Sequence, residues 1–554
     1  MRSSNLRSKV EPAASTRRSR TRDDGIDAKF RSLLVVDIHP EEQLEAFAAM
    51  QPGGIVVRRR HTRDPAQVRE LICRHQALAE FPLMVAGNFE WGVANDVRGC
   101  RSFFPGVLAL AAACGDDLSL AQAQAEAIGR EARSLGVNTV FGPAIDVIQG
   151  ESTEVGTRGF SRDPGRVAAY ADRYIRGLQA GGVAAVGKHF PGGGAGKVDS
   201  HLGLPVLKET WGDLQRCNLK PFIAAIAAGV GGLMTSHNAY PAINGDRCPG
   251  TMSARLAQLL RTELGFEGFL ITDNMGMGAT AKHFPPSELL LGPLRGGHDL
   301  VLVRSEIVNP RLLAECGEII RQEPALQERI EVAFERMTGI RRCWRMGMST
   351  GSHARLEETS RVLGEEISRK AIAVLRDPAH LLPLSEQRYG RILIVSPQVR
   401  DGFHIALPSN FGYLAMELKR HILEAELVFP ADSPSAEEQA AILAKAKQAQ
   451  VVVLEMHDEQ SLTGLAAGQI QLCRRLMRSC GDKLVIAGLY SPQFLERLPP
   501  IGAAVFAFSA MPASQVALAR VLLGTCKAGG NPSPLNPKHA RPARRARRRV
   551  TKLR

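Results

Sequence analysis

The chain has 554 residues, of which 44% are apolar, so it is too long for one ordinary domain and has enough apolar side chains for two hydrophobic cores. It has no uninterrupted apolar run near the roughly 18 residues that a membrane span requires. No apolar stretch follows the basic N-terminus, as one would in a signal peptide. We therefore expect a cytoplasmic protein without a membrane span.

The basic residues concentrate at the C-terminal end. The formal net charge is +14, and residues 527–554 contain ten lysines and arginines and no acidic residue. This proline-rich stretch has no apolar periodicity, so we expect a disordered tail over 526–554, and a disordered basic N-terminus over 1–28. A solvated tail is favoured over one that binds nucleic acid, so no specific nucleic-acid partner is expected. If nucleic-acid association were the function, deleting the tail would abolish it.

Short apolar runs, most of them followed by a helix-like segment, recur through the first 300 residues. Eight such runs occur, at 32–38, 54–58, 82–87, 137–147, 182–189, 231–237, 266–273 and 297–303. Eight strands alternating with helices predict a (β/α)8 barrel of the TIM type. We assign residues 29–347 to this barrel, including a closing helical stretch at 310–342.

A second α/β pattern follows the barrel. A polar segment predicts a linker over 348–362, and residues 363–525 are then predicted to form a smaller α/β sandwich domain. Its apolar runs lie at 392–395, 426–429, 451–456, 484–489 and 503–507, with helical segments such as 435–448 and 466–477 between them. Continuous apolar runs are typical of a mostly parallel sheet covered on both faces. No cluster of polar groups in this domain indicates chemistry.

Polar side chains stand where the predicted barrel strands end. In chain order they are Asn88 and Glu90 after the third run, Asp146, Lys188 and His189, His237, and Asp273. Catalytic groups of such barrels lie at the carboxyl ends of the strands, because the loops there converge on one mouth. The pattern therefore predicts a single site at that mouth.

The segment 187–205 reads GKHFPGGGAGKVDSHLGLP. A strand delivers Lys188 and His189 to the mouth, and a glycine-rich loop then carries Asp199 and His201. A carboxylate two residues from an imidazole can fix its tautomer and raise its pKa, which makes a workable general acid/base. A phosphate-binding loop is not predicted, because Val198 stands where that motif needs a hydroxyl.

Two further segments complete the set of candidates. The segment 268–277 reads GFLITDNMGM, and its apolar strand places the carboxylate of Asp273 at the rim, where it could attack an anomeric carbon. Taken alone, Asp273 could equally cap a helix. The segment 156–164 reads GTRGFSRDP, in which Arg158 could fork onto sugar hydroxyls and Asp163 followed by proline predicts a turn that opens a helix.

Together these segments resemble glycoside hydrolase family 3, and specifically its bacterial β-N-acetylglucosaminidase branch, in which a KHFPG strand end leads to a DSH loop. The resemblance extends over about 32–524 and includes FGPAIDV at 141–147, MTSH at 234–237, AIAVLR at 371–376 and LPL at 382–384. It implies a retaining exo-glycosidase that removes terminal β-linked N-acetylhexosamine from amino-sugar glycans such as muropeptides.

The resemblance also implies a two-step mechanism. Asp273 would form a covalent glycosyl-enzyme, while His201, polarised by Asp199, protonates the leaving oxygen and later activates water. The substrate-binding positions would be Asn88, Glu90, Arg158, Lys188, His189 and His237. The mechanism needs no metal or cofactor, and no cluster of His, Asp and Glu has ligand spacing.

Two segments depart from the family pattern. The family usually has D-x-E-G-G after the third strand, whereas residues 88–92 read NFEWG, and its usual PGHGD loop is PGGGA at 191–195. The amide of Asn88 still forms hydrogen bonds to hydroxyls but loses charge-assisted strength of about 1 kcal/mol or more. Because Asp199 and His201 survive, these departures favour a shifted substrate preference over loss of activity.

Several alternatives stay open. A histidine in place of the usual carboxylate acid leaves one negative charge fewer in the site, which could admit phosphate and make the reaction phosphorolytic. A β-glucosidase or β-xylosidase of the same family would usually draw its acid/base from the second domain and lack the DSH loop. A catalytically silent sugar-binding protein would account for the losses at Asn88 and Gly193.

Overall fold

The structure, a computed structural model, describes residues 22–149, 155–194, 196, 198–347, 353–398, 412–431, 433–457, 466–497 and 501–532. Helix α1 (Arg22–Arg31) begins within the region predicted to be disordered at 1–28, and its Ile26 packs into the core. Residues 1–21 and most of the predicted tail lie outside the described ranges. Within those ranges, no helix is long and apolar enough to cross a membrane.

The first sheet is the predicted barrel of eight parallel strands, and each predicted apolar run contributes one of them. They are β1 (Leu34–Asp37), β2 (Gly54–Val56), β3 (Met84–Gly87), β4 (Thr139–Val140), β5 (Ala184–Phe190), β6 (Gly232–Thr235), β7 (Phe269–Thr272) and β8 (Val301–Leu302). Their hydrogen-bonded order is β7-β6-β5-β4-β3-β2-β1-β8. A parallel bridge between Ile271 and Leu300 joins the two ends of this order, so all strand ends on one side meet at one mouth.

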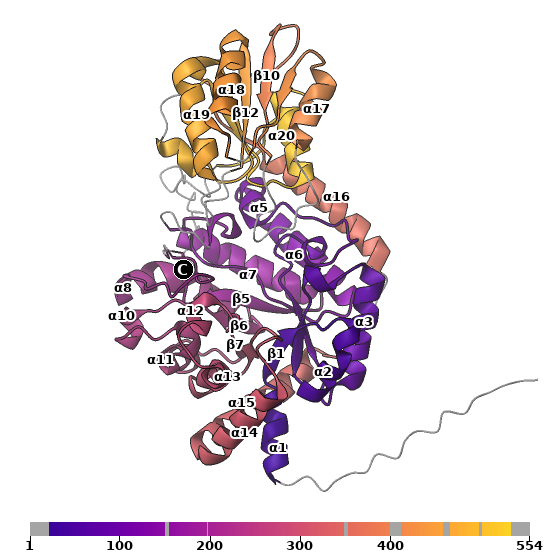
Figure 1. The fold of residues 1–554 in the computed structure, drawn as a ribbon, viewed down its shortest axis with the longest axis vertical. Helices are drawn as coiled ribbons and strands as arrows, with labels where there is room; N and C mark the ends of the chain where they lie inside the picture. The colour runs from indigo at the N-terminus through magenta and orange to yellow at the C-terminus, as the bar shows by residue number, and fades with distance from the viewer. Residues whose placement is uncertain are drawn as a thin grey trace, which may run out of the picture.

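Helices surround the strands (Figure 1). They are α2 (Leu44–Met50), α3 (Pro65–Leu78), α4 (Val93–Asp96), α5 (Val107–Cys114), α6 (Ser119–Ser134), α7 (Pro164–Ala180), α8 (Trp211–Asp213), α9 (Leu219–Ala227), α10 (Pro241–Asn244), α11 (Ala254–Gln258), α12 (Gly278–Ala281), α13 (Pro286–Arg295), α14 (Pro310–Gln322) and α15 (Pro324–Cys343). The caps Asp64, Asp163 and Asn309, each followed by proline, begin α3, α7 and α14 and accept a backbone N–H hydrogen bond there.

The fourth predicted run is mostly not strand. Only Thr139 and Val140 form β4, because Pro143 has no N–H to donate to a ladder. Pairing resumes at Ala144, which bridges to Lys188, and the Ile145 N–H donates to the Lys188 carbonyl over 2.8 Å. This interrupted strand carries Asp146 to the end of β5.

The second sheet has six strands, in the order β11-β10-β12-β13-β14-β9. They are β9 (Ala373–Arg376), β10 (Ile392–Val395), β11 (Glu426–Val428), β12 (Val451–Met456), β13 (Leu484–Gly488) and β14 (Ala503–Phe506), with helices α17 (Tyr413–His421), α18 (Ala436–Gln448), α19 (Ala466–Cys480) and α20 (Pro512–Leu522). All pairs are parallel except β9 with β14. The predicted mostly parallel α/β sandwich is confirmed, and β9 is a strand that the sequence pattern did not indicate.

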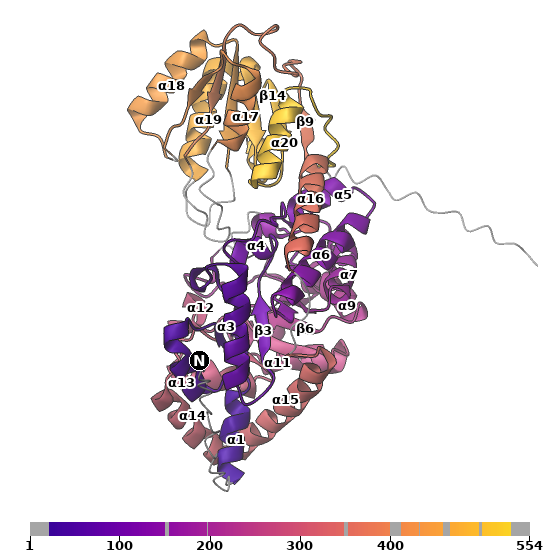
Figure 2. The ribbon, with the colours of Figure 1, turned by 90° about the vertical axis from the view of Figure 1, so that its right-hand side faces the viewer.

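One helix, α16 (His353–Ala371), connects the two sheets and occupies most of the predicted linker (Figure 2). It packs on α5 and α6 of the barrel and on α20 of the second domain. The two domains also share apolar cores. Leu108 and Ala109 of α5 belong to a cluster with second-sheet residues such as Leu454, and Trp91 belongs to the cluster on the other face of that sheet.

Candidate active site

A cavity of about 480 Å³ opens at the carboxyl ends of the barrel strands. Its lining includes seven of the predicted site residues, namely Asn88, Glu90, Arg158, Lys188, His189, His201 and Asp273. The two others do not line it, but each contacts a residue that does. Asp199 contacts His201, and His237 contacts Asn274. The structure therefore brings the predicted set together in one place.

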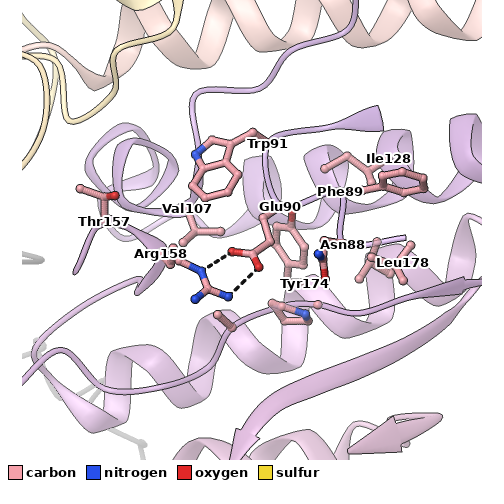
Figure 3. Close-up of a pocket in the computed structure, with 14 residues that line it drawn as sticks. Asn88, Phe89, Glu90, Trp91, Val107, Ile128, Thr157, Arg158, Tyr174 and Leu178 are labelled. Carbon is pink, nitrogen blue, oxygen red and sulfur yellow. Dashed lines mark hydrogen bonds and ion pairs between the residues drawn. The ribbon is translucent and has the colours of Figure 1, made fainter. Parts of the chain in front are cut away.

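Glu90 is the centre of a buried charge cluster (Figure 3). The Arg158 guanidinium donates two hydrogen bonds of 2.8 Å to its two carboxylate oxygens, and the Lys188 ammonium lies 2.6 Å from one of them. Burial alone would raise the pKa of Glu90, but these two cations hold it well below its usual range. The Lys188 ammonium also donates to Asn88 Oδ1 over 3.3 Å. Fixed cations and carboxylate oxygens of this kind can grip sugar hydroxyls from one side.

Asp146 orients His189 at the end of β5. One of its oxygens accepts from the His189 backbone N–H over 3.0 Å and contacts the His189 Nδ1 at 2.8 Å. The other accepts from the Gly193 N–H over 2.6 Å. Burial would raise the pKa of Asp146, but His189 and these N–H groups lower it, so the carboxylate stays ionised. His189 Nδ1 therefore carries a proton, and Nε2 faces Asp273 Oδ2 at 4.0 Å.

Asp273 follows β7 and reaches the cavity with 22% of its side chain exposed. Its Oδ1 accepts from the Asn274 N–H over 2.7 Å. Burial alone would raise its pKa, but the neighbouring His237 and His189 imidazoles, the Asn274 N–H and a nearby lysine lower it to about 2. A carboxylate that is ionised at neutral pH and open to a cavity can act as a nucleophile.

His237 is buried beside Asp273 rather than exposed to the cavity. Its Nε2 donates to the Asn274 carbonyl over 2.9 Å, and its Nδ1 accepts from the Thr251 hydroxyl over 3.0 Å. Burial is the main reason why the pKa of His237 is lowered, so the ring is neutral. This geometry lets His237 position the backbone that holds Asp273, whereas sugar binding by His237 stays a prediction.

The predicted dyad forms at the rim. His201 Nδ1 lies 2.7 Å from Asp199 Oδ1, and the same oxygen accepts the His201 backbone N–H over 2.9 Å. The loop that carries the dyad lies against the segment that follows Asp273. There the Gly278 and Ala279 N–H groups donate to the carbonyls of His201 and Ser200. His201 thus lines the same cavity as Asp273 with its Nδ1 held by a carboxylate, which is the geometry of a general acid/base.

Sequence reasoning missed part of the cavity wall. The additional charged lining residues are Asp37, Arg58, Arg59, Arg60, Asp96 and Arg304. Three of them form a run of arginines directly after β2, and such a run at the end of a predicted barrel strand is a signal that could have found them.

The sequence of the barrel matches a known protein family. Residues 25–340, more than half of the chain, match the Glycosyl hydrolase family 3 N terminal domain. The chain belongs to glycoside hydrolase family 3.

Two relatives and one solved structure, the last of which is named as a family 3 protein, agree with this assignment. The chain is 34% identical to a beta-hexosaminidase of Nitrosospira multiformis over 256 residues, which are 45% of this chain and 73% of that protein. It is 28% identical to a beta-N-acetylglucosaminidase/beta-glucosidase of Cellulomonas fimi over 388 residues, 66% of each chain. A solved glycoside hydrolase family 3 beta-N-acetylglucosaminidase from Paenibacillus sp. str. FPU-7 superposes with a TM-score of 0.82 and 28% identity, covering 92% of this chain and 98% of that chain.

The glycine-rich loop of this family 3 barrel makes its contacts through the backbone. A Cβ atom on Gly194 would lie 1.7 Å from the Val147 carbonyl oxygen, so only glycine fits there. The neighbouring Gly193 N–H bonds to Asp146. Gly193 and Gly194 are thus held by backbone contacts although the sequence of the loop lacks the imidazole and the carboxylate that the resemblance led us to expect.

Proposed function

We propose that this family 3 protein is a retaining β-N-acetylhexosaminidase that removes terminal β-linked N-acetylglucosamine from amino-sugar glycans such as muropeptides. The observation that carries the proposal is the meeting of an ionised carboxylate, Asp273, and the His201–Asp199 dyad at one cavity. The names of the relatives support the sugar, and the buried Glu90 cluster supplies fixed groups for its hydroxyls.

In the first step the Asp273 carboxylate forms a bond to the anomeric carbon as the glycosidic bond breaks, and His201 gives its proton to the leaving oxygen. Asp199 accepts the Nδ1 proton of His201 and stabilises the imidazolium, which carries the transferred proton on its other ring nitrogen. In the second step His201 takes a proton from water, which attacks the anomeric carbon and releases the carboxylate. Two displacements on one carbon give net retention.

The experiment is nitrophenol release from the β-N-acetylglucosaminide and from the β-glucoside by wild type, Asp273→Gly and Asp116→Asn. Asp116 is the matched control, because its side chain is 98% exposed. We expect rapid turnover of the acetamido sugar, a loss of about 10³-fold or more in Asp273→Gly, and wild-type rates in Asp116→Asn. Azide should restore nitrophenol release in Asp273→Gly and give the α-glycosyl azide. A folded wild type that turns over neither sugar would favour a sugar-binding protein instead.

Phosphorolysis is a second candidate function, favoured by the histidine that stands where most glycosidases have a second carboxylate. Without that negative charge, an anionic acceptor meets less repulsion on its way to the glycosyl-enzyme. In phosphate buffer this reaction would give the sugar 1-phosphate, which ³¹P NMR detects, in place of the free sugar.

A further inference from the structure

Four arginines line the part of the cavity wall contributed by β2 and β8. Three follow β2 and one follows β8, and we call them the arginine rim: Arg58, Arg59, Arg60 and Arg304. In the strand order β2 and β8 flank β1, so the rim lies across the eight-stranded ring from β5, which carries Lys188 and His189. Lys188 and His189 therefore face the mouth from the side opposite the rim, whereas Asn88 and Glu90 follow β3, which pairs with β2 beside the rim.

The four arginines of the rim have two carboxylate partners, Asp37 and Glu306, the second of which lies 3.5 Å from Arg60. Asp37 lies between two of them, with Oδ1 accepting from Arg58 Nε over 2.8 Å and Oδ2 paired with Arg60. Within the described part of the chain, no hydrogen bond or ion pair engages the Arg304 side chain. The whole cavity is lined by six cationic side chains and four carboxyl groups, and two of those cations already serve Glu90.

Two of the rim arginines are held in place by backbone. Arg59 donates to the Ala94 carbonyl over 2.9 Å and lies 3.4 Å from the Asn95 carbonyl oxygen. The stem of Arg304 lies on Gly276, where a Cβ atom would be 3.0 Å from Arg304 Cγ. Gly276 is three residues after the nucleophile. Guanidinium groups that are already in place suit the oxygens of carboxylate and phosphate groups. Neutral hydroxyls do not require an excess of positive charge.

We propose that the arginine rim is a subsite for an oxyanion, a carboxylate or a phosphate, in the same cavity as the proposed sugar site. The proposal rests on the proposed function, which places the sugar against the Glu90 cluster. The oxyanion has two possible sources. It is carried by the leaving group, or it is free hydrogen phosphate, one oxygen of which bonds to the anomeric carbon as the bond to Asp273 breaks, giving the sugar 1-phosphate and the free carboxylate.

The test compares two substrates, 4-nitrophenyl β-N-acetylglucosaminide and its analogue with a carboxylate on the nitrophenyl ring. The variants are Arg59→Gln, Arg304→Gln and the matched control Arg63→Gln, whose side chain is 79% exposed and lies outside the cavity lining. We expect the ratio of kcat/KM for the charged over the neutral substrate to fall about ten-fold in the first two variants and to stay constant in the control.

If the ratio stays constant but phosphate gives sugar 1-phosphate in wild type and less of it in Arg304→Gln, the acceptor is the source of the oxyanion. If neither quantity changes in the rim variants, the proposal is overturned. If wild type hydrolyses neither substrate, the proposed function fails. The subsite is then judged by Tm, which inorganic phosphate must raise in wild type and leave unchanged in Arg304→Gln.

Discussion

Replacing Glu90 by glutamine should lower the free energy of unfolding far more than the same change at a glutamate that pairs with an arginine near the surface. Glu90 accepts two bonds from Arg158 and one from Lys188, and its side chain is 10% exposed. Glutamine keeps one acceptor oxygen but no charge, so the two buried cations lose the negative charge of Glu90. Breaking a buried ion pair in this way costs about 3–5 kcal/mol.

The lower end of that range is expected, because Lys188 has a way to relieve the strain. Burial already lowers the pKa of Lys188, and Glu90 is the main group that raises it. Without Glu90 the ammonium can release its proton, which removes one of the two buried positive charges. We therefore expect a loss of about 3 kcal/mol, which corresponds to a Tm lower by about 3–5 °C.

The matched control is Glu288→Gln. Glu288 accepts two bonds, of 2.8 and 2.9 Å, from Arg295, but their side chains are 39% and 31% exposed. An exposed pair contributes at most about 1 kcal/mol. Urea unfolding at pH 7, with kcat/KM measured on the same preparations, provides the comparison. Equal losses in the two variants would refute the reasoning that burial sets the strength of the Glu90 cluster.

Three further predictions concern the nucleophile and the loops. Asp199→Asn should lower kcat by about 10²–10⁴-fold, with a smaller loss on a dinitrophenyl glycoside that needs little protonation; equal losses on both substrates would argue against an acid/base role for His201. Because the folded-state pKa of Asp273 is lowered to about 2, its ionised form stabilises the fold above the unfolded pKa, and this stability is lost as pH falls. Between pH 6 and pH 3 the unfolding free energy of wild type relative to Asp273→Asn should fall by about 1 kcal/mol, whereas a difference that is constant with pH would contradict that pKa. Gly194→Ala should destabilise the protein by about 1–3 kcal/mol through overpacking, but Gly203→Ala, whose nearest neighbour would be 3.8 Å away, should not; thermal unfolding separates the two.

Much of the barrel could be predicted because each of its strands is a short apolar run followed by a polar residue. The rule that catalytic groups sit at strand ends placed Glu90, Lys188 and Asp273 at one mouth, and the structure brings them together. The motif around His201 likewise indicated its partner Asp199, since two residues so close in sequence can bond without help from distant parts of the chain.

Other features depend on contacts that no local pattern encodes. Pro143 ends β4 early, and only the pairing with β5 shows that the chain returns at Ala144. Strand β9 has an exposed or half-buried residue at three of its four positions, so it lacks the continuous apolar run that revealed the other strands. The burial of His237 could not be foreseen either, because it follows from the packing of its neighbours.

Trp91 connects the second domain with the proposed sugar site. Its indole lines the catalytic cavity and also belongs to the apolar cluster of the second sheet, together with residues such as Ile372. A barrel cut after residue 347 would leave this side chain, and Leu108 on α5, facing water. Excision of the catalytic half alone should therefore yield an insoluble fragment or one with a deformed mouth. We expect the barrel alone to lose activity, because Trp91, which lines its cavity, packs against the other half.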